Sequence, residues 1–388
     1  MPSDRAVRPA FITTVPYLGG AELGLLRLIK EQRREGIHPA VVVVHSGDGL
    51  SELYRSANLP VSEFTLHRWQ LGRPWRYCQS LLQLAYPIIE HRANLIHISH
   101  HYGLAFTVQA ARLSRRPFLI HVRGVESEEW VAENLRFLES AARIIAVSEA
   151  VKRRLTSCGV LQERIEVVYD GVDLAELGGH RSLGRGALDD LFARGESGKL
   201  IGIVGRVVPL KGIEDFLQAV AILSPDVPEL HAVVVGTGPP EYARVLKQLA
   251  ARLGIDGRVK FIGHRQDVAK ILAQLDVLVL ATHDREMGRE EACPNIVLEA
   301  MACRTPVVAT RSGGVVELLA DDRGVTATPG DAADLVRGIL RVLCMRDDER
   351  VAMLDRARGA VERHFTIQEH SRQILGLYAE VLEGQRSA

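Results

Sequence analysis

Short apolar runs alternate with longer stretches of helical spacing through the first half of this 388-residue chain. Two runs rich in β-branched residues, Ala10–Val15 and Ala40–His45, enclose residues Glu22–Arg34, where apolar side chains recur every three or four positions. The runs predict buried strands, and the stretch between them predicts a helix. This order is typical of a parallel βαβ unit. Four more strands are predicted in this half: Leu95–Ser99, Phe118–Val122, Arg143–Val147 and Ile165–Tyr169.

The pattern fades between Leu174 and Lys199, where glycines stand among charged residues, and this change predicts a domain boundary. We therefore predict an α/β fold with two Rossmann-like, doubly wound parallel sheets. The predicted ranges are 1–175 for the first domain, 176–198 for a linker and 199–365 for the second domain, which suits a chain too long for one hydrophobic core. The second series of strands is Leu200–Val204, His231–Val235, Val259–Ile262, Val277–Leu280 and Pro306–Ala309.

Composition and charge narrow the classes of function. Forty-eight basic residues balance forty-eight acidic ones, and no nucleic-acid-binding motif is present, so we expect no nucleic-acid partner. The five cysteines contain no Cys-x-x-Cys pair, which argues against a disulfide framework and a structural zinc site. The sequence opens with no signal-peptide pattern, and no apolar run approaches the ~20 residues that span a bilayer. We therefore expect a cytoplasmic protein. The alternative is a cytoplasmic protein that is attached weakly to the inner face of the membrane.

The loop after Leu200–Val204 carries the first candidate chemistry. Residues Gly205 to Gly212 place Arg206 and Lys211 between a strand and the predicted helix Ile213–Leu223. A guanidinium and an ammonium group can neutralise the two charges of a diphosphate, and glycines let the backbone approach it. Solvated basic side chains in an ordinary turn are the alternative reading of this pair taken alone.

Two glutamates and a helix start form the second candidate. Glu291 and Glu299 are separated by seven residues, a spacing that a glutamate-rich chain produces by chance, so only the context is informative. Pro294 suits the first turn of a helix through Ala302, and backbone amides at a helix start favour an anion. A third and weaker sign is the Gly19–Gly20 turn after the first strand, since glycine pairs commonly serve only as turns.

With these elements in order, the sequence resembles the retaining GT-B glycosyltransferases of family four, also described as group 1 transferases. Each fragment is modest, but their order and spacing together are specific and run through most of the chain. The fragments in the first half are Gly19-Gly-Ala-Glu22, Ala146-Val-Ser-Glu-Ala-Val-Lys152 and Val168-Tyr-Asp-Gly-Val-Asp173. Those in the second half are Val204-Gly-Arg206 with Lys211-Gly212, Val235-Gly-Thr-Gly-Pro239, Phe261-Ile-Gly263, Glu291–Ala302, Pro306-Val-Val-Ala309 and Ser312-Gly-Gly314 with Glu317.

The resemblance implies an architecture and an activity. In the GT-B fold two domains face each other across a cleft, and a C-terminal helix, here residues 366–388, packs back on the first domain. The implied enzyme is a retaining hexosyltransferase that needs no metal and no cofactor. It would move a sugar from a UDP-, GDP- or ADP-sugar to a carbohydrate, lipid-linked or small-molecule acceptor in polysaccharide, lipopolysaccharide or glycoconjugate biosynthesis. A monomer or a homodimer is expected.

The resemblance also assigns roles to matching residues. Arg206 and Lys211 would hold the donor diphosphate and stabilise the leaving group, which is a task that otherwise needs a metal ion. Glu291 would contact hydroxyls of the transferred sugar, and His121 stands where family members have a histidine that faces this sugar. The other implied donor contacts are Gly19, Gly20 and Gly205 near the diphosphate, Cys293, Pro294, Asn295 and Ile296 at the helix start, Glu299 on the ribose, and Gly263, His264 and Arg265 near the base.

The sequence departs from the family at three positions. Glycine is common in the family where Ala292 and Arg304 stand, and asparagine is common where Asp170 stands. Arg304 places a large charged side chain behind the donor helix, so we expect the chemistry to be intact and the choice of donor to be affected.

Other readings remain open at this point. A nucleotide-sugar epimerase or a non-catalytic nucleotide-sugar-binding protein would share the fold and the donor. The histidines His97, His100, His101 and His121 suggest a metal site, but nearby carboxylates are missing, so a polar lining is favoured. Groups of basic residues offer a surface for anionic lipid, but solvated helix faces are the favoured interpretation. The groups are Arg27, Lys30, Arg33 and Arg34, then Arg112, Arg115 and Arg116, then Lys152, Arg153 and Arg154.

Overall fold

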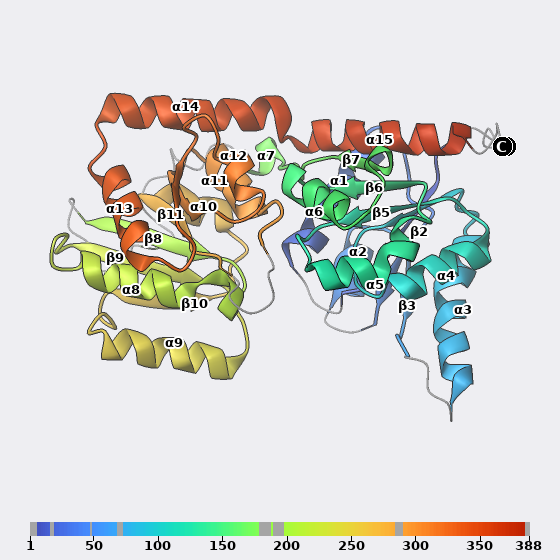
Figure 1. Cartoon of the computed structure of the whole chain (residues 1–388), viewed down its shortest axis with the longest axis horizontal. Helices are drawn as coiled ribbons and strands as arrows, with labels where there is room; N and C mark the ends of the chain where they lie inside the picture. Colours follow the sequence, from blue (N-terminus) through green and yellow to red (C-terminus); the bar gives the residue numbers. More distant parts are fainter. Residues whose placement is uncertain are drawn as a thin grey trace. The chain divides into compact units, whose positions relative to one another are not determined.

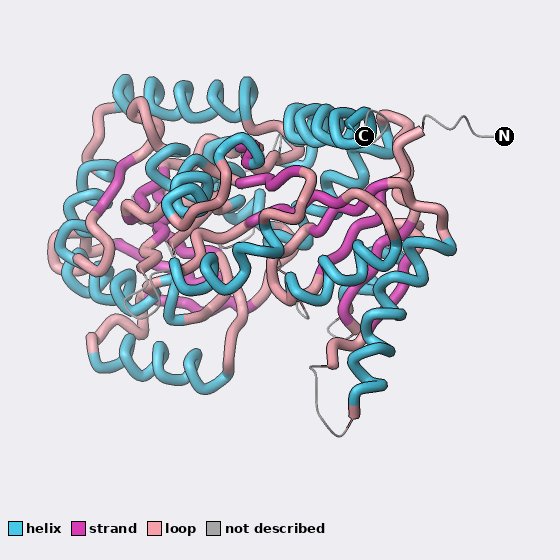
Figure 2. The backbone as a smooth tube through the Cα atoms, turned by 45° about the vertical axis from the view of Figure 1, so that its right-hand side comes forward, coloured by secondary structure: helices cyan, strands magenta, loops and turns pink. Residues whose placement is uncertain are grey.

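The computed structural model describes residues 6–15, 19–46, 49–67, 73–177, 188, 198–283 and 290–384. The chain forms two compact units (Figure 1, Figure 2). The first consists of residues 1–171 and 367–388, and the second of residues 172–366. The chain thus leaves the first unit four residues before the boundary expected at 175. Most of the expected linker, 176–198, lies outside the described residues, and its first two residues belong to the short helix α7, Leu174–Leu177.

A seven-stranded parallel sheet forms the centre of the first unit, in the order β3-β2-β1-β4-β5-β6-β7. The order reverses between β1 and β4, and both strands are entirely buried, as expected for parallel strands that are covered on two faces. The strands are β1 (Pro9–Thr13), β2 (Val41–His45), β3 (Val61–Phe64), β4 (Leu95–Ile98), β5 (Phe118–Val122), β6 (Arg143–Ala146) and β7 (Ile165–Val167).

Helices from both ends of the chain cover this sheet. The last helix, α15, packs against α1 and shares a hydrophobic cluster with it and with the strands, including Phe11, Leu28 and Ile374. It is therefore part of the core of the first unit (Figure 1). The helices of this unit are α1 (Gly20–Arg34), α2 (Leu50–Ser56), α3 (Pro74–Glu90), α4 (Leu104–Ser114), α5 (Glu128–Leu138), α6 (Glu149–Ser157) and α15 (Ile367–Gly384), with a 3-10 turn at Gln162–Arg164.

The second unit repeats the plan with six parallel strands in the order β10-β9-β8-β11-β12-β13. Side chains of α8, α9 and α13, such as Phe216, Leu246 and Ile339, form one large cluster with the strands, while α11 packs on α10 and α14. The strands are β8 (Lys199–Val204), β9 (Leu230–Val235), β10 (Val259–Gly263), β11 (Val277–Leu280), β12 (Val307–Thr310) and β13 (Val325–Ala327). The helices are α8 (Ile213–Leu223), α9 (Pro240–Arg252), α10 (Val268–Gln274), α11 (Asn295–Ala302), α12 (Val315–Leu318), α13 (Ala332–Leu343) and α14 (Asp347–His364), with a 3-10 turn at Pro209–Lys211.

The predicted α/β fold with two doubly wound parallel sheets is confirmed. Every predicted strand is present, and its ends differ from the prediction by two residues at most. The pattern missed β3 and β13, which pair with a single neighbour at the edge of their sheets. An edge strand tolerates polar residues such as Ser62 and Glu63, so it shows no continuous apolar run.

Candidate active site

The order of the second sheet reverses between the adjacent parallel strands β8 and β11. Loops that leave two such strands in opposite directions open a crevice at the carboxyl edge, where ligands of these sheets bind. The loop after β8 carries Arg206 and Lys211, and the segment after β11 leads to Glu291. The main candidate residues of the second unit therefore lie at its topological switch point.

Lys211 and Glu291, eighty residues apart in the sequence, form an ion pair at this edge. Lys211 Nζ donates to Glu291 Oε1, and the hydroxyl of Thr282 donates to the same oxygen at 2.9 Å. The side chains of Lys211 and Glu291 are only 19% and 12% exposed, so the pair is largely shielded from water. Charge-assisted hydrogen bonds of this kind hold both groups in fixed positions. The structure thus brings together two residues that the sequence predicted to bind the donor.

Two glycines make this close arrangement sterically accessible. Gly212 precedes α8 with φ of +62°, and a Cβ there would lie 1.9 Å from the carbonyl oxygen of Ala281. Gly313 has φ of +49°, and a Cβ there would lie 2.1 Å from the carbonyl oxygen of Glu291. Ser312 Oγ in turn accepts a hydrogen bond from the Glu291 amide at 3.1 Å. Any side chain at either glycine would push the backbone segments of the site apart.

Glu291 is a carboxylate in these surroundings. Burial by itself raises the pKa of this carboxyl, but the charge and hydrogen bond of Lys211, the hydroxyl of Thr282 and the field of Arg206 outweigh it. The pKa of Glu291 therefore lies below its usual value. An ionised carboxylate only accepts hydrogen bonds, so Glu291 is suited to bind sugar hydroxyls and not to act as a general acid.

Arg206 lies on the exposed side of the same loop. Together with Gly205 and Lys211 it lines a small hollow at the ends of the strands. The hollow itself has room for about one water molecule, but an arginine fork and a lysine point charge on one loop can neutralise a diphosphate together. The other lining residues are Ile203, Val204, Ile213, Val234, Val235 and Leu280.

The predicted donor helix is α11. It begins at Asn295, directly after Pro294, and ends at Ala302 as predicted. This start places Glu299 one turn inside the helix, where its side chain is half-buried. Pro294 is buried, and Cys293, Asn295 and Ile296 are half-buried around the helix start.

Arg304, one of the departures from the family, lies two residues beyond the end of this helix. Arg304 has φ of +57°, and the Thr305 amide donates to the carbonyl of Ala300 at 2.9 Å, which is the pattern of a helix that closes on a left-handed residue. This conformation explains why glycine suits the position. The arginine side chain reaches Asp355 on α14, with Nη1 and Oδ1 2.5 Å apart. The positive charge that Arg304 brings to this position is therefore paired with the carboxylate of Asp355 on α14.

The residues predicted to lie near the base are the last residue of β10 and the two residues after it. Gly263 has a left-handed backbone with φ of +69°, and His264 is exposed. Arg265 donates two hydrogen bonds to Asp267, at 2.8 and 2.7 Å. The guanidinium of Arg265 is thus held by a carboxylate two residues away.

In the first unit, Gly19 and Gly20 mark the start of α1, as predicted. The amide of Gly19 donates to Glu22 Oε2 at 3.0 Å, so this amide already has an acceptor. A phosphate at this position would have to compete with the Glu22 carboxylate for it.

The histidines considered as metal ligands form two groups in the first unit. His97 Nε2 lies 3.2 Å from His121 Nδ1, and both side chains are completely buried. His101 Nε2 lies 2.8 Å from Glu126 Oε1, and its ring is 5.2 Å from that of His100. Within the described ranges, no three histidine, cysteine, aspartate or glutamate side chains are grouped so that they could hold a metal ion.

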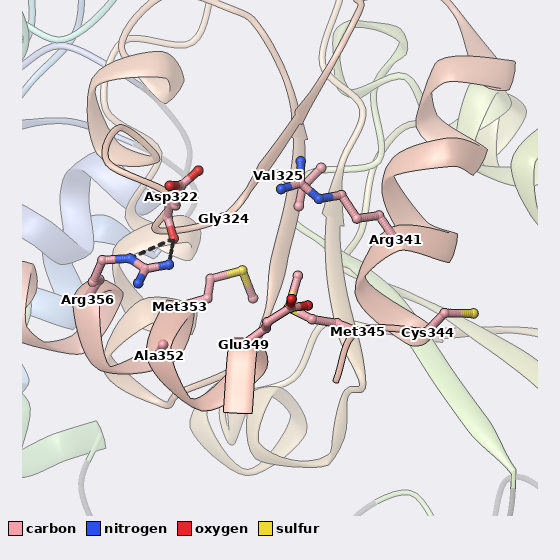
Figure 3. Close-up of a pocket in the computed structure, with 10 residues that line it drawn as sticks. All are labelled: Asp322, Gly324, Val325, Arg341, Cys344, Met345, Glu349, Ala352, Met353 and Arg356. Atoms are coloured by element: carbon pink, nitrogen blue, oxygen red, sulfur yellow. Dashed lines mark hydrogen bonds between the residues drawn. The ribbon is translucent and has the colours of Figure 1, made fainter. Parts of the chain in front are cut away.

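A separate hollow in the second unit lies where α13 ends and α14 begins (Figure 3). Arg341 and Glu349 project toward it, and Arg356 donates to the carbonyl of Asp322 at 3.2 Å. None of the residues predicted to bind the donor lines this hollow, so it is distinct from the switch point.

The sequence did not predict the residues that hold Glu291 and the loop after β11. Thr282 and Ser312 hydrogen-bond to Glu291, and His283 Nδ1 lies 2.9 Å from Asp215 Oδ2 on α8. Serine and threonine are too common to stand out in a single sequence. Their position is informative, because Thr282 lies two residues beyond β11 at the switch point.

Comparisons with known proteins agree with this arrangement. A family model described as Glycosyltransferase Family 4 matches residues 18–176, and one described as Glycosyl transferases group 1 matches residues 198–345. N-acetyl-alpha-D-glucosaminyl L-malate synthase of Bacillus anthracis is 25% identical over 97% of this chain and 98% of its own length. D-inositol 3-phosphate glycosyltransferase of Salinispora tropica is 32% identical over 58% of this chain and 48% of its own length.

Solved structures share the fold. HepE of Anabaena in complex with UDP superposes with a TM-score of 0.81 at 24% identity, over 96% of this chain and all of that one. A glycosyltransferase of Rickettsia africae gives a TM-score of 0.83 at 18% identity, over 97% and 99% of the two chains. These likenesses confirm the GT-B fold class that the sequence resemblance implied.

Proposed function

This chain belongs to the group 1 glycosyltransferases of family four, and from that premise we propose that it transfers a sugar from a nucleotide diphosphate sugar to a hydroxyl group with retention of configuration. The observation that carries the proposal is the shielded Lys211 and Glu291 pair at the switch point, with Arg206 on the same loop. It places two cations beside a carboxylate that accepts hydrogen bonds. A diphosphate and the sugar attached to it need these groups side by side.

In this proposal Arg206 and Lys211 bind the diphosphate and stabilise the charge that grows on the leaving group, so no metal ion is needed. Glu291 holds hydroxyls of the transferred sugar, and Glu299 holds the ribose. His121 of the first unit donates a hydrogen bond to the sugar. The remaining contacts with the donor are assigned to Gly19, Gly20, Gly205, Gly263, His264, Arg265, Cys293, Pro294, Asn295 and Ile296.

The reaction takes place on one face of the sugar. The bond between the anomeric carbon and the diphosphate breaks first, through an oxocarbenium-like state. The acceptor hydroxyl then bonds to the anomeric carbon, and its proton passes to the departing phosphate oxygen. No carboxylate nucleophile is required, in contrast to retaining glycosidases, which need two carboxyl groups about 5–5.5 Å apart.

We propose a UDP-sugar as the donor, because solved structures of HepE contain UDP and UDP-glucose. A ligand that binds only the folded protein at 100 times its Kd adds about 2.7 kcal/mol to the free energy of unfolding. In a thermal-shift panel with UDP, GDP and ADP, UDP is expected to raise the midpoint by about 5–10 °C for a domain of this size. EDTA is expected to leave the shift unchanged. The proposal fails if no nucleotide shifts the midpoint, or if EDTA abolishes the shift.

The acceptor is proposed to be lipid-linked, with the protein attached weakly to an anionic membrane. The carrying observation is an exposed apolar stripe on α3, formed by Trp75, Leu82, Tyr86 and Ile89, whose exposures are 60%, 62%, 61% and 50%. These positions share one face of the helix, and α3 packs beside α4 and the edge strand β3 (Figure 1). Tryptophan and tyrosine suit the boundary between water and lipid.

Basic residues accompany this stripe. Arg73 and Arg76 lie at the exposed start of α3, and Arg112, Arg115 and Arg116 are exposed at the end of α4, which packs against α3. By contrast, Arg33 and Arg34 on α1 donate to the carbonyl of Ala57 and to Glu31. The membrane surface is therefore assigned to α3 and α4. In the described part of the chain, no helix is both long enough and apolar enough to span a bilayer.

Loss of the stripe is expected to release the protein from vesicles. The double variant Leu82→Ser and Tyr86→Ser replaces two apolar side chains of the stripe with polar ones. It is expected to weaken binding to phosphatidylglycerol vesicles at low salt by about tenfold or more. Co-sedimentation measures this. The matched control is Ile222→Ser with Val245→Ser, which changes two exposed apolar residues of the second unit and is expected to bind like the wild type. Equal binding of the stripe variant and the wild type would contradict the assignment.

A further inference from the structure

A chain of hydrogen-bonding side chains crosses the interior of the first unit. It starts at Tyr378 on α15, whose hydroxyl lies 2.6 Å from His97 Nδ1 on β4. His97 Nε2 lies 3.2 Å from His121 Nδ1 on β5. Arg123 Nη2 lies 3.3 Å from the same Nδ1 atom, and Arg123 Nη1 donates to both oxygens of Asp170 at 2.6 and 2.8 Å. All five side chains are buried, so their hydrogen bonds are shielded from water.

The N–H groups of Arg123 determine which ring nitrogens of His121 and His97 carry protons. A guanidinium has donors and no acceptor, so His121 Nδ1 must accept from it. A neutral imidazole carries one N–H, which then lies on Nε2 of His121. The lone pair of His121 Nδ1 is then shared between the N–H groups of Arg123 and of His97 Nε2, and His97 Nδ1 accepts from the hydroxyl of Tyr378. The opposite tautomer of His121 would set its N–H against that of Arg123.

His121 is neutral in this environment. Burial lowers its pKa well below the usual value, and the charge of Arg123 and the neighbouring His97, His370 and His100 lower it further. Its Nε2 atom is buried and has no hydrogen-bond partner in the described structure. A buried donor without a partner is rare in proteins and points to a ligand.

We propose that the Arg123 and Asp170 pair fixes His121 as the Nε2–H tautomer, so that His121 donates a hydrogen bond to a sugar hydroxyl and does not act as a base. Arg123 and Asp170 are positioning residues, since they act through His121. The tautomer follows from the first unit alone, whereas the contact with the sugar rests on the proposed function.

The charge of Asp170 is needed beside Arg123. The side chain of Arg123 is only 3% exposed, and a buried guanidinium needs an opposite charge nearby. Asp170 supplies that charge, whereas a neutral asparagine would leave Arg123 uncompensated.

The tautomer can be observed directly in the free enzyme. Long-range ¹⁵N–¹H correlation spectra of the ¹⁵N-histidine-labelled full chain at pH 7.5 distinguish the protonated nitrogen of each ring. The His121 signals are identified by their loss in His121→Gln. The wild type is expected to show a protonated Nε2 and an unprotonated Nδ1. A proton on Nδ1, or on both nitrogens, would overturn the proposal.

Two variants test the cause of the tautomer. Arg123→Met combined with Asp170→Asn removes both charges together and leaves no buried charge alone. Its His121 signals are expected to change to a mixture of tautomers or to Nδ1–H. Tyr378→Phe is the matched control, because it removes a hydroxyl of the same network that does not touch His121. The proposal is wrong if the double variant keeps the wild-type pattern.

Transfer rates test the contact with the sugar separately. Glutamine can donate a hydrogen bond from its amide but cannot take up a proton at neutral pH. His121→Gln is therefore expected to stay within about tenfold of the wild-type kcat, while His121→Ala loses about a hundredfold. Equal losses in both variants, or wild-type rates in both, would overturn the donor role of His121 while the tautomer and the glycosyltransferase activity stand.

Discussion

Replacing Arg206 or Lys211 with alanine is expected to lower the kcat of sugar transfer by about 10²–10³-fold, because each removes one cation that stabilises the charge on the leaving diphosphate. Both residues border the same hollow at the switch point, and Lys211 also holds Glu291. Since no metal ion is proposed to share the task, no other group replaces the lost charge. Initial rates with a UDP-sugar and an acceptor measure the effect.

The two variants separate catalysis from stability. Lys211→Ala leaves Glu291 buried without its cation, so a loss of stability is expected along with the loss of turnover. Arg206 is exposed, so Arg206→Ala is expected to keep the melting temperature of the wild type. Lys199→Ala is a matched control, since Lys199 also lies within 4 Å of a carboxylate, Asp276, but outside the site. Near-normal turnover in both Arg206→Ala and Lys211→Ala would remove these residues from the mechanism.

Much of the fold could be predicted from the sequence, because parallel strands that are buried on both faces appear as continuous apolar runs. Phe118–Val122 and Val277–Leu280 were predicted with the bounds that the structure shows. The edge strands β3 and β13 were not predicted, since an edge position does not require such a run. The position of the site also followed from the topology, because the loops after β8 and β11 lie at the point where the strand order reverses.

The contacts within the site could not be predicted in the same way. The spacing of Glu291 and Glu299 carries no information, and nothing local in the sequence links Lys211 to a carboxylate eighty residues away. The hydrogen bonds that Thr282 and Ser312 form with Glu291 depend on how three separate loops meet in the folded chain. Likewise, the role of Asp170 appears only when β5 brings Arg123 beside it. Such contacts depend on tertiary packing, which a single sequence does not encode in any local pattern.

His97 and His121 are expected to cost the first unit at most about 3 kcal/mol of stability between pH 7.5 and pH 5.5. Burial is the main reason that the pKa values of His97 and His121 lie well below the usual one, and the charge of Arg123 adds to it. In the unfolded chain both histidines return to a pKa of about 6.5. Over this pH range the unfolded state therefore binds more protons than the folded state, so stability is present above pH 6.5 and is lost as the pH falls. Each histidine contributes about 1.4 kcal/mol over these two pH units.

Urea denaturation followed by tryptophan fluorescence measures this effect, because Trp69, Trp75 and Trp130 all belong to the first unit. The urea midpoint is expected to be clearly lower at pH 5.5 than at pH 7.5. The double variant His97→Asn with His121→Asn is expected to show a clearly smaller difference, since asparagine takes up no proton, while the buried His370 keeps its own contribution. The exposed His38 provides the matched control, and His38→Asn is expected to keep the wild-type difference. Equal midpoints at both pH values in the wild type would show that the two buried histidines bind protons in the folded protein, and the neutral His121 assigned above would then be wrong.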